Sequence, residues 1–216
     1  FMRDMVLNFL IAGRDTTAQC LTWTLFELAQ HPAALDKVRA EVAAVCGDGR
    51  LDYQHLKDLK YVRAVVDEGL RLHPSVPCDS KVAVAADTLP DGTRVPAGCM
   101  LQFCPYAQGR CEALWGGDAG AFRPERWLER RRPSTFEYVN FNAGPRECLG
   151  RRLAEVEMAA LLAVLVRSFD FELAVRPEAV RYDMQLTLGC STGLPMLVKP
   201  RMPRLLDSAG LEKSTH

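Results

Sequence analysis

The chain has 216 residues and 48% hydrophobic content, which is long enough for one domain with a substantial core. Its formal net charge is zero, so no overall electrostatic field favours nucleic acid or an acidic partner. Eight cysteines are present, but none forms a Cys-x-x-Cys pair and no secretory leader precedes them, so we expect most to be reduced.

Residues 2–30 are predicted to form one long buried helix. Apolar residues such as Met5, Phe9 and Leu21 recur at helical spacing, and no proline interrupts the pattern before Pro32. The chain opens inside this pattern with neither a methionine nor a helix cap. We therefore expect the full-length protein to have a further N-terminal part, and targeting signals usually lie there.

The middle of that helix carries a polar segment, Ala12-Gly13-Arg14-Asp15-Thr16-Thr17. Gly13 opens a gap beside the helix, and Ala12 and Thr16 share one face because they stand four residues apart. A threonine hydroxyl can also bond to the carbonyl four residues earlier. The segment predicts a site with space, a proton donor and a nearby acid, although an Asp-Thr pair also suits an ordinary helix bend.

Two more helices are expected at 31–46, which Gly47 ends, and at 60–72, which Pro74 ends. On the second of these, Glu68 and Arg71 share a face and can pair. A generic surface pair of this kind contributes only about 0.3 to 0.5 kcal/mol, so the pair alone indicates little.

The next part of the chain is expected to be a small β region, with strands at 81–85, near 95 and at 99–103, and a loop with one helical turn at 105–117. Further short strands are expected at 169–175, 184–188 and 196–199.

Residues 123–132 hold five arginines against two glutamates. With Arg151 and Arg152 they form a candidate basic surface for an acidic redox partner, the alternative being an ordinary solvated face.

A distinctive loop, Phe141-Asn142-Ala143-Gly144-Pro145-Arg146-Glu147-Cys148-Leu149-Gly150, comes directly before a predicted helix at 153–166. Unpaired N–H groups at a helix start favour a thiolate at Cys148, and Gly144 and Pro145 give the loop its shape. A thiolate held in this way suits the axial position of a haem iron, with Arg146 close enough to pair with a propionate. A single cysteine at a helix start is otherwise a structural, buried cysteine.

The spacing Phe-x-x-Gly-x-Arg-x-Cys-x-Gly resembles the cysteine loop of the haem-thiolate monooxygenases, the cytochrome P-450 family. The polar helix segment, the Glu-x-x-Arg pair and the Pro-Glu-Arg segment that ends at Arg126 occur in the same order as in that family. The resemblance implies a mainly α fold with small β-sheets, the C-terminal portion of the cytochrome P-450-like fold. Residues 1–202 are then the C-terminal part of one haem-thiolate monooxygenase domain, and residues 203–216 a polar tail that we expect to be disordered.

The resemblance also implies roles for individual residues. Cys148 would be the metal ligand, and the proton-delivering pair would be Asp15 and Thr16. The residues implied to surround haem b, iron protoporphyrin IX, are Arg146, Phe141, Gly144, Lys81, Ala12 and Gly13, together with Cys148. A structural lock behind the haem is implied for Glu68, Arg71 and Arg126.

The implied activity is insertion of one oxygen atom from O2 into a small apolar substrate, with electrons from NADPH through a reductase or another donor. Residues 89–98, Tyr106-Ala107-Gln108-Gly109-Arg110 and Leu114-Trp115-Gly116 are similar to the fatty-acid ω-hydroxylases of plants and algae, which implies a fatty acyl substrate. We expect this chain alone to be inactive.

The full-length protein is expected at the cytosolic face of the endoplasmic reticulum membrane. This chain contains no anchor, because its longest apolar run, Met158 to Val166, falls far short of the roughly 20 residues that span a bilayer.

Other readings remain open. A haem-thiolate peroxide isomerase would need no external electrons, although Asp15 and Thr16 argue against it, and a non-catalytic fragment without bound haem is a second possibility. A zinc or structural cysteine protein is the third, but the spacing of Cys99, Cys104 and Cys111 does not fit the usual ligand pairs.

Overall fold

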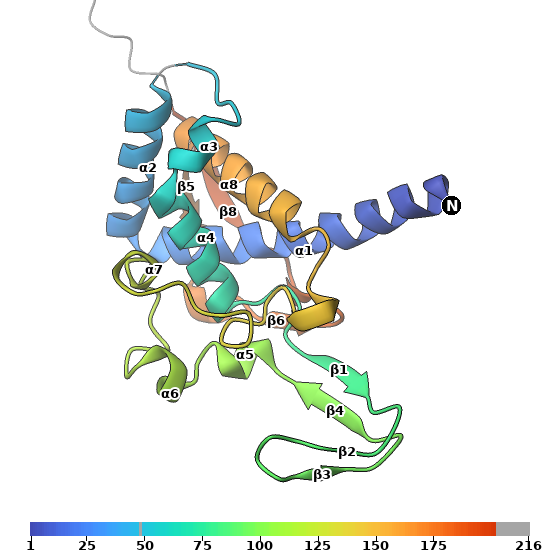
Figure 1. Ribbon diagram of the computed structural model, residues 1–216. Helices are drawn as coiled ribbons and strands as arrows, with labels where there is room; N and C mark the ends of the chain where they lie inside the picture. Colours follow the sequence, from blue (N-terminus) through green and yellow to red (C-terminus); the bar gives the residue numbers. More distant parts are fainter. Residues whose placement is uncertain (48, 202–216) are drawn as a thin grey trace, which may run out of the picture.

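The computed structural model describes residues 1–47 and 49–201 (Figure 1). Long helices dominate, and they are α1 (Met2–Gln30), α2 (Pro32–Cys46), α4 (Lys60–Leu72) and α8 (Arg151–Ser168). The shorter helical elements are α3 (His55–Asp58), α5 (Pro105–Gln108), α6 (Glu112–Trp115), α7 (Arg126–Glu129) and two 3-10 turns, η1 (Gly144–Arg146) and η2 (Pro177–Ala179).

The strands of the described residues form small antiparallel pairs. They are β1 (Asp79–Val82) with β4 (Met100–Phe103), β2 (Asp87–Thr88) with β3 (Arg94–Val95), β5 (Phe169–Leu173) with β8 (Met196–Pro200), and β6 (Tyr182–Met184) with β7 (Leu188–Cys190). The expected fold class, mainly α with small β-sheets, is confirmed. The expected tail at 203–216 lies outside the described residues.

The core lies where α4 packs against α1, α2 and α8 (Figure 1). Leu28, Val38, Val62 and Leu162, one from each of these helices, are all fully buried. Apolar residues that recur on one face of a helix remove that face from water, and this burial is the main force that holds the four helices together.

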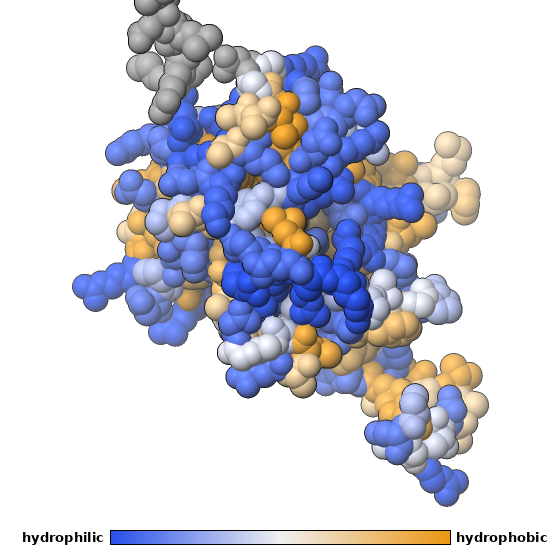
Figure 2. All heavy atoms as spheres, turned by 60° about the vertical axis from the view of Figure 1, so that its left-hand side comes forward, coloured by the Kyte–Doolittle hydropathy of each residue, from blue (hydrophilic) through white to orange (hydrophobic). Residues whose placement is uncertain are grey.

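The prediction that the whole of residues 2–30 is buried was wrong. The buried side chains of α1 all lie between Thr17 and Leu28. Its first part projects from the body, and exposed apolar side chains there include Leu10 at 62% and Ile11 at 71% (Figures 1 and 2). Helical periodicity reports that a face is apolar, but it does not report whether another element covers that face.

Several predicted elements differ from the observed ones. The helices at 2–30 and 60–72 are confirmed, whereas 105–117 contains two short helices, α5 and α6. The prediction of a continuous strand at 184–188 was wrong, because Met184 ends β6, Leu188 begins β7, and residues 185–187 form the turn between them, in which Gln185 N donates to the Thr187 carbonyl. Short apolar alternation looks the same in a strand and in a turn between strands.

None of the described helices is both long enough and apolar enough to cross a membrane.

Candidate functional site

Three charged side chains from two distant segments form a buried cluster. Glu68 and Arg71 of α4 are fully buried, and Arg126 of α7 is 2% exposed. Arg71 donates from Nε to Glu68 Oε2 and from Nη2 to Oε1, both at 2.8 Å. Arg126 Nε donates to Glu68 Oε1 at 2.9 Å. The structure therefore brings together the three residues predicted to form a lock.

Further groups form hydrogen bonds with this cluster. Trp127 Nε1 donates to Glu68 Oε2 at 2.9 Å, and the backbone N–H of Arg123 donates to Oε1 at 2.8 Å. Arg71 also donates to the carbonyl of Gly109, where a Cβ would lie 2.1 Å from the Arg71 carbonyl oxygen. Only glycine fits there, so the backbone of residue 109 can approach α4 closely.

The loop at residues 141–150 is closed by one backbone hydrogen bond, in which Cys148 N donates to the Phe141 carbonyl at 2.7 Å. Two of its residues have left-handed backbone conformations, Asn142 with φ 63° and Gly144 with φ 60°. Asparagine is among the few residues other than glycine that accept this conformation, which reverses the chain. The loop has the tight shape that its sequence predicts.

Cys148 lies near the start of α8, as predicted, with Leu149 and the N-cap residue Gly150 between it and the helix. Arg151, the first residue of that helix, donates its N–H to the Cys148 carbonyl at 3.3 Å. Cys148 is exposed, and its sulfur has no hydrogen-bond partner among residues 1–47 and 49–201. The sulfur is thus available to an outside group, and its role as a thiolate ligand stays a prediction.

The two cations predicted for propionates differ in their surroundings. Arg146, in η1, is exposed and has no acidic partner in the described part of the chain. Lys81, on β1, pairs with Asp79 at 2.8 Å. Asp79 also accepts a hydrogen bond from Asn142 Nδ2 at 3.1 Å. The β1 strand is therefore tied to the cysteine loop through Asp79, a contact that no motif predicts.

The polar segment of α1 has the local geometry that its sequence predicts. Thr16 Oγ1 donates to the Ala12 carbonyl at 2.8 Å. A Cβ added to Gly13 would meet nothing within 4 Å, so open space lies beside the helix. Ser75 Oγ donates to the Thr16 carbonyl at 2.7 Å, which ties this turn of α1 to the segment after α4. Ser75 carried no sequence signal.

Asp15 and Thr17, in the same segment, differ in their burial and in their partners. Asp15 is exposed and pairs with Arg14 at 2.7 Å, and the hydrogen bond from Arg14 lowers the pKa of the Asp15 carboxyl. The Thr17 hydroxyl is buried with no hydrogen-bond partner in the described residues. Leaving such a group unpaired costs about 1 to 3 kcal/mol.

No hydrogen bond or ion pair joins residues 12–17 to residues 141–150 within the described ranges. The two segments belong to one body because α1 packs against α8 (Figure 1).

The predicted basic surface is largely neutralised. Arg126 is buried in the cluster, and four other arginines pair with nearby acids: Arg123 with Asp118 and Glu129, Arg131 with Glu137, Arg132 with Glu155, and Arg151 with Glu147 and Glu155. Arg130 is half-buried, where it donates to the Leu114 carbonyl and has no acidic partner in the described residues. Arg152 is exposed without an acidic partner in the described part of the chain. Counting arginines along the sequence missed acids that come from other elements.

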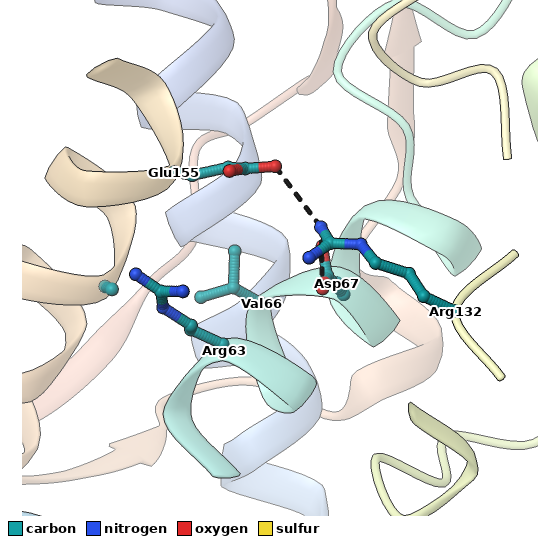
Figure 3. A pocket seen from close by; sticks show the side chains of 6 residues that line it. Arg63, Val66, Asp67, Arg132 and Glu155 are labelled. Carbon is teal, nitrogen blue, oxygen red and sulfur yellow. Dashed lines mark hydrogen bonds and ion pairs between the residues drawn. The ribbon is translucent and has the colours of Figure 1, made fainter. Parts of the chain in front are cut away.

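A cavity of about 20 Å³, room for a single water molecule, lies between α4, α8 and the segment before the cysteine loop (Figure 3). Asp67 and Glu155 face Arg132 across it, at 3.8 Å and 3.3 Å. Burial raises the pKa of Asp67 from its ordinary 3.8 to about 6, against the opposing effect of Arg132. This titratable group is structural and lies apart from the predicted catalytic residues.

Comparison with known proteins points to one family. The family model described as Cytochrome P450 matches residues 2–193. The chain is 40% identical to Cytochrome P450 704C1 of Pinus taeda, over 94% of this chain and 43% of that protein. It is 37% identical to Alkane hydroxylase MAH1 of Arabidopsis thaliana, over 94% of this chain and 40% of that protein. It is 35% identical to Cytochrome P450 94A2 of Vicia sativa, over 94% of this chain and 41% of that protein. The chain spans less than half the length of these curated relatives.

Replacing Glu68 by alanine should destabilise the full-length protein by about 3 to 5 kcal/mol, because Arg71 and Arg126 would stay buried without their carboxylate. Urea unfolding measures this loss. The matched control is Glu129→Ala, which removes the exposed partner of Arg123 and should cost less than about 1 kcal/mol. Equal losses in the two variants would contradict the assigned importance of the buried cluster.

Asp67 should make stability depend on pH in an identifiable way. The pKa of Asp67 is higher in the folded protein than in the unfolded chain, so the folded protein binds this proton more strongly. The protonated Asp67 therefore adds to the free energy of unfolding at low pH, and this stabilisation is lost as pH rises from about 4 to about 6. The free energy of unfolding of wild type, relative to Asp67→Asn, should therefore decline by up to about 3 kcal/mol across that window. Unfolding at several pH values measures this difference, and Asp36→Asn on the exposed face of α2 is the control. A difference that does not change with pH would refute the burial effect.

Proposed function

The chain belongs to the cytochrome P450 family, and from that premise we propose that the protein is a haem-thiolate monooxygenase that hydroxylates a fatty acyl chain. The observation that supports the proposal is the exposed Cys148, at the end of a closed loop and three residues before the first residue of α8. A structural cysteine would be buried among apolar side chains, as Cys20 is. The position of Cys148 instead suits a ligand for a metal outside the chain.

The residues present fit haem b. Cys148 supplies a soft sulfur ligand, and the exposed Arg146 supplies a cation for a propionate. Lys81 is a second candidate cation, although it would share its charge with Asp79. Ala12 and Gly13 would make room for the haem, since there is open space beside α1 at Gly13. Phe141 and Gly144 contribute through the backbone shape of the loop.

Haem b, when bound, supplies the iron chemistry that activates O2, and a thiolate ligand pushes electron density toward the oxygen. The task of the loop is to hold the Cys148 sulfur rigidly at a helix start, where the N–H groups of α8 favour negative charge. The Glu68 cluster supports this task because it holds the segment before the loop against α4.

Thr16 is the proposed proton donor. Its hydroxyl donates to the Ala12 carbonyl, and its oxygen can accept a hydrogen bond from water at the same time. When the hydroxyl rotates away from the carbonyl it can give up its proton, and the water bonded to its oxygen supplies the proton that replaces it. Ser75 holds the Thr16 carbonyl and so restrains this turn of the helix. Asp15, exposed and paired with Arg14, is placed to exchange protons with solvent.

The proposed substrate, a fatty acyl chain hydroxylated at or near its methyl end, has two supports. Residues 89–98 are similar to fatty-acid ω-hydroxylases, and one relative is named an alkane hydroxylase. Both point to an unbranched hydrocarbon chain. Such a chain is recognised by buried area, about 0.8 kcal/mol per methylene, so selectivity between neighbouring chain lengths should be modest.

The proposed electron source is NADPH through a reductase, and the proposed location is the cytosolic face of the endoplasmic reticulum membrane. Arg152 is the unpaired cation next to the cysteine loop that an acidic donor would meet. A requirement for NADPH separates this function from peroxide isomerisation, which needs no external electrons.

Cys148→Ser should abolish thiolate ligation in the full-length protein. The reduced carbon monoxide complex of wild type should show the strongly red-shifted Soret band of a thiolate-bound haem, and the variant should lack it. Cys111→Ser, at a half-buried cysteine away from the loop, should keep the band. A red-shifted band in Cys148→Ser would exclude Cys148 as the ligand.

Thr16→Ala should bind haem and consume NADPH but lose product. We expect product per NADPH to fall about tenfold or more, because a positioned proton donor typically contributes 10² to 10⁴ in rate, and the electrons should appear as hydrogen peroxide. The matched control is Thr22→Ala on the same helix, since Thr22 makes the same bond to the carbonyl four residues earlier, also at 2.8 Å. Equal coupling in both variants would remove Thr16 from the proton path.

A further inference from the structure

Two half-buried cysteines face each other at the end of the β1–β4 pair. Cys78 directly precedes β1, and Cys104 directly follows β4. The strand register pairs Asp79 with Phe103, so Cys78 and Cys104 occupy the next position of the ladder. Their sulfur atoms lie 3.4 Å apart. No other two of the cysteines in the described residues are hydrogen-bonded to each other through sulfur.

The backbone at this position suits a covalent bond between the two sulfurs. Ala83 N donates to the Cys99 carbonyl at 2.9 Å, which marks that pair as a hydrogen-bonded one. Pair types alternate along an antiparallel ladder, so Cys78 and Cys104 form a pair without backbone hydrogen bonds between them. Such pairs have Cα atoms about 4.5 Å apart, inside the range of about 4.4 to 6.8 Å found in disulfides.

The thiols are already aligned with each other. Cys78 Sγ donates to Cys104 Sγ, and Cys104 Sγ donates to the Pro77 carbonyl at 3.3 Å. The hydrogen bond to Cys104 is the first cause of a raised pKa for Cys78, so little of this cysteine is thiolate at neutral pH.

We propose that Cys78 and Cys104 are a reversible disulfide site that takes a low-molecular-weight disulfide, such as oxidised glutathione, as its oxidant. One cysteine thiolate attacks a glutathione sulfur, forms a mixed disulfide and releases one glutathione thiolate. The second cysteine then attacks the protein sulfur, the Cys78–Cys104 bond forms, and the second glutathione leaves. Two cysteine thiols are oxidised, one disulfide is reduced, and the two protons end on the two glutathione thiols.

A disulfide at this position restrains the ends of β1 and β4. It closes a ring that contains β1 to β4, and it lies next to Asp79, which accepts the hydrogen bond from Asn142 of the cysteine loop. Small two-stranded pairs open easily because little apolar surface holds them. Oxidation therefore fixes the strand ends next to the cysteine loop, and reduction releases them.

Mass spectrometry of the full-length protein, equilibrated with increasing ratios of oxidised to reduced glutathione and then alkylated, tests the site directly. We expect a linked pair of peptides that contain Cys78 and Cys104, lighter by two hydrogen atoms and separated again by dithiothreitol. Hydrogen exchange of residues 79–82 and 100–103 should slow in the oxidised form, while exchange in α2 should not change.

Cys78→Ser and Cys104→Ser should each lose the linkage and the slowed exchange. Cys99→Ser is the matched control because Cys99 directly precedes β4, at the other end of that strand, and its sulfur bonds to the Met100 carbonyl and to no cysteine in the described residues. It should keep both effects. Separate alkylation or glutathionylation of Cys78 and Cys104 in wild type at every ratio, or linkage of either to a different cysteine, would overturn the site. Unchanged exchange in the linked protein would overturn its tethering effect.

Discussion

The structure depends on one buried carboxylate, that of Glu68. Removing such a group from water costs several kcal/mol, so Glu68 is tolerated only because donors surround both of its oxygens. These donors come from Arg71, Arg126, Trp127 and the backbone of Arg123. Most of them lie far along the chain from α4, so the irregular segment after β4 must return to this helix before the carboxylate can be buried.

The helix that carries Glu68 also positions both parts of the candidate site. On the cysteine side, Tyr138 Oη donates to the Asp67 carbonyl at 3.2 Å, shortly before the loop begins. Directly after the C-terminus of α4, the His73 ring lies 2.6 Å from a Glu27 carboxylate oxygen of α1 and 2.9 Å from the Tyr182 hydroxyl. Burial is the first cause of a lowered pKa for His73, so a neutral imidazole is favoured between its two partners. The surroundings of both candidate segments, residues 12–17 and residues 141–150, are therefore bonded to α4 or to the residues that follow it. No hydrogen bond or ion pair joins the two segments to each other within the described residues.

The long helices could be predicted because their apolar pattern continues over many turns, as in 60–72. Burial of the Glu68–Arg71 pair could not, since a pair three residues apart looks the same on an exposed helix and in a core. The contacts of Asp79 with Asn142 and of Cys78 with Cys104 depend on strand register and loop path, which no local pattern contains. Motif spacing located the candidate residues of the loop and of α1, whereas their roles remain predictions.

The polar groups discussed above fall into two sets: those with hydrogen-bond or ion-pair partners and those without a partner in the described residues. The charged groups of the Glu68 cluster are paired, which is what a group that serves stability requires. Arg146 and the Cys148 sulfur have no such partners in the described residues, and the Thr17 hydroxyl is buried without one. Unpaired groups add nothing to folding, and a buried one opposes it. The free energy of folding therefore comes from the helices and from the paired Glu68 cluster, and these three groups contribute none of it.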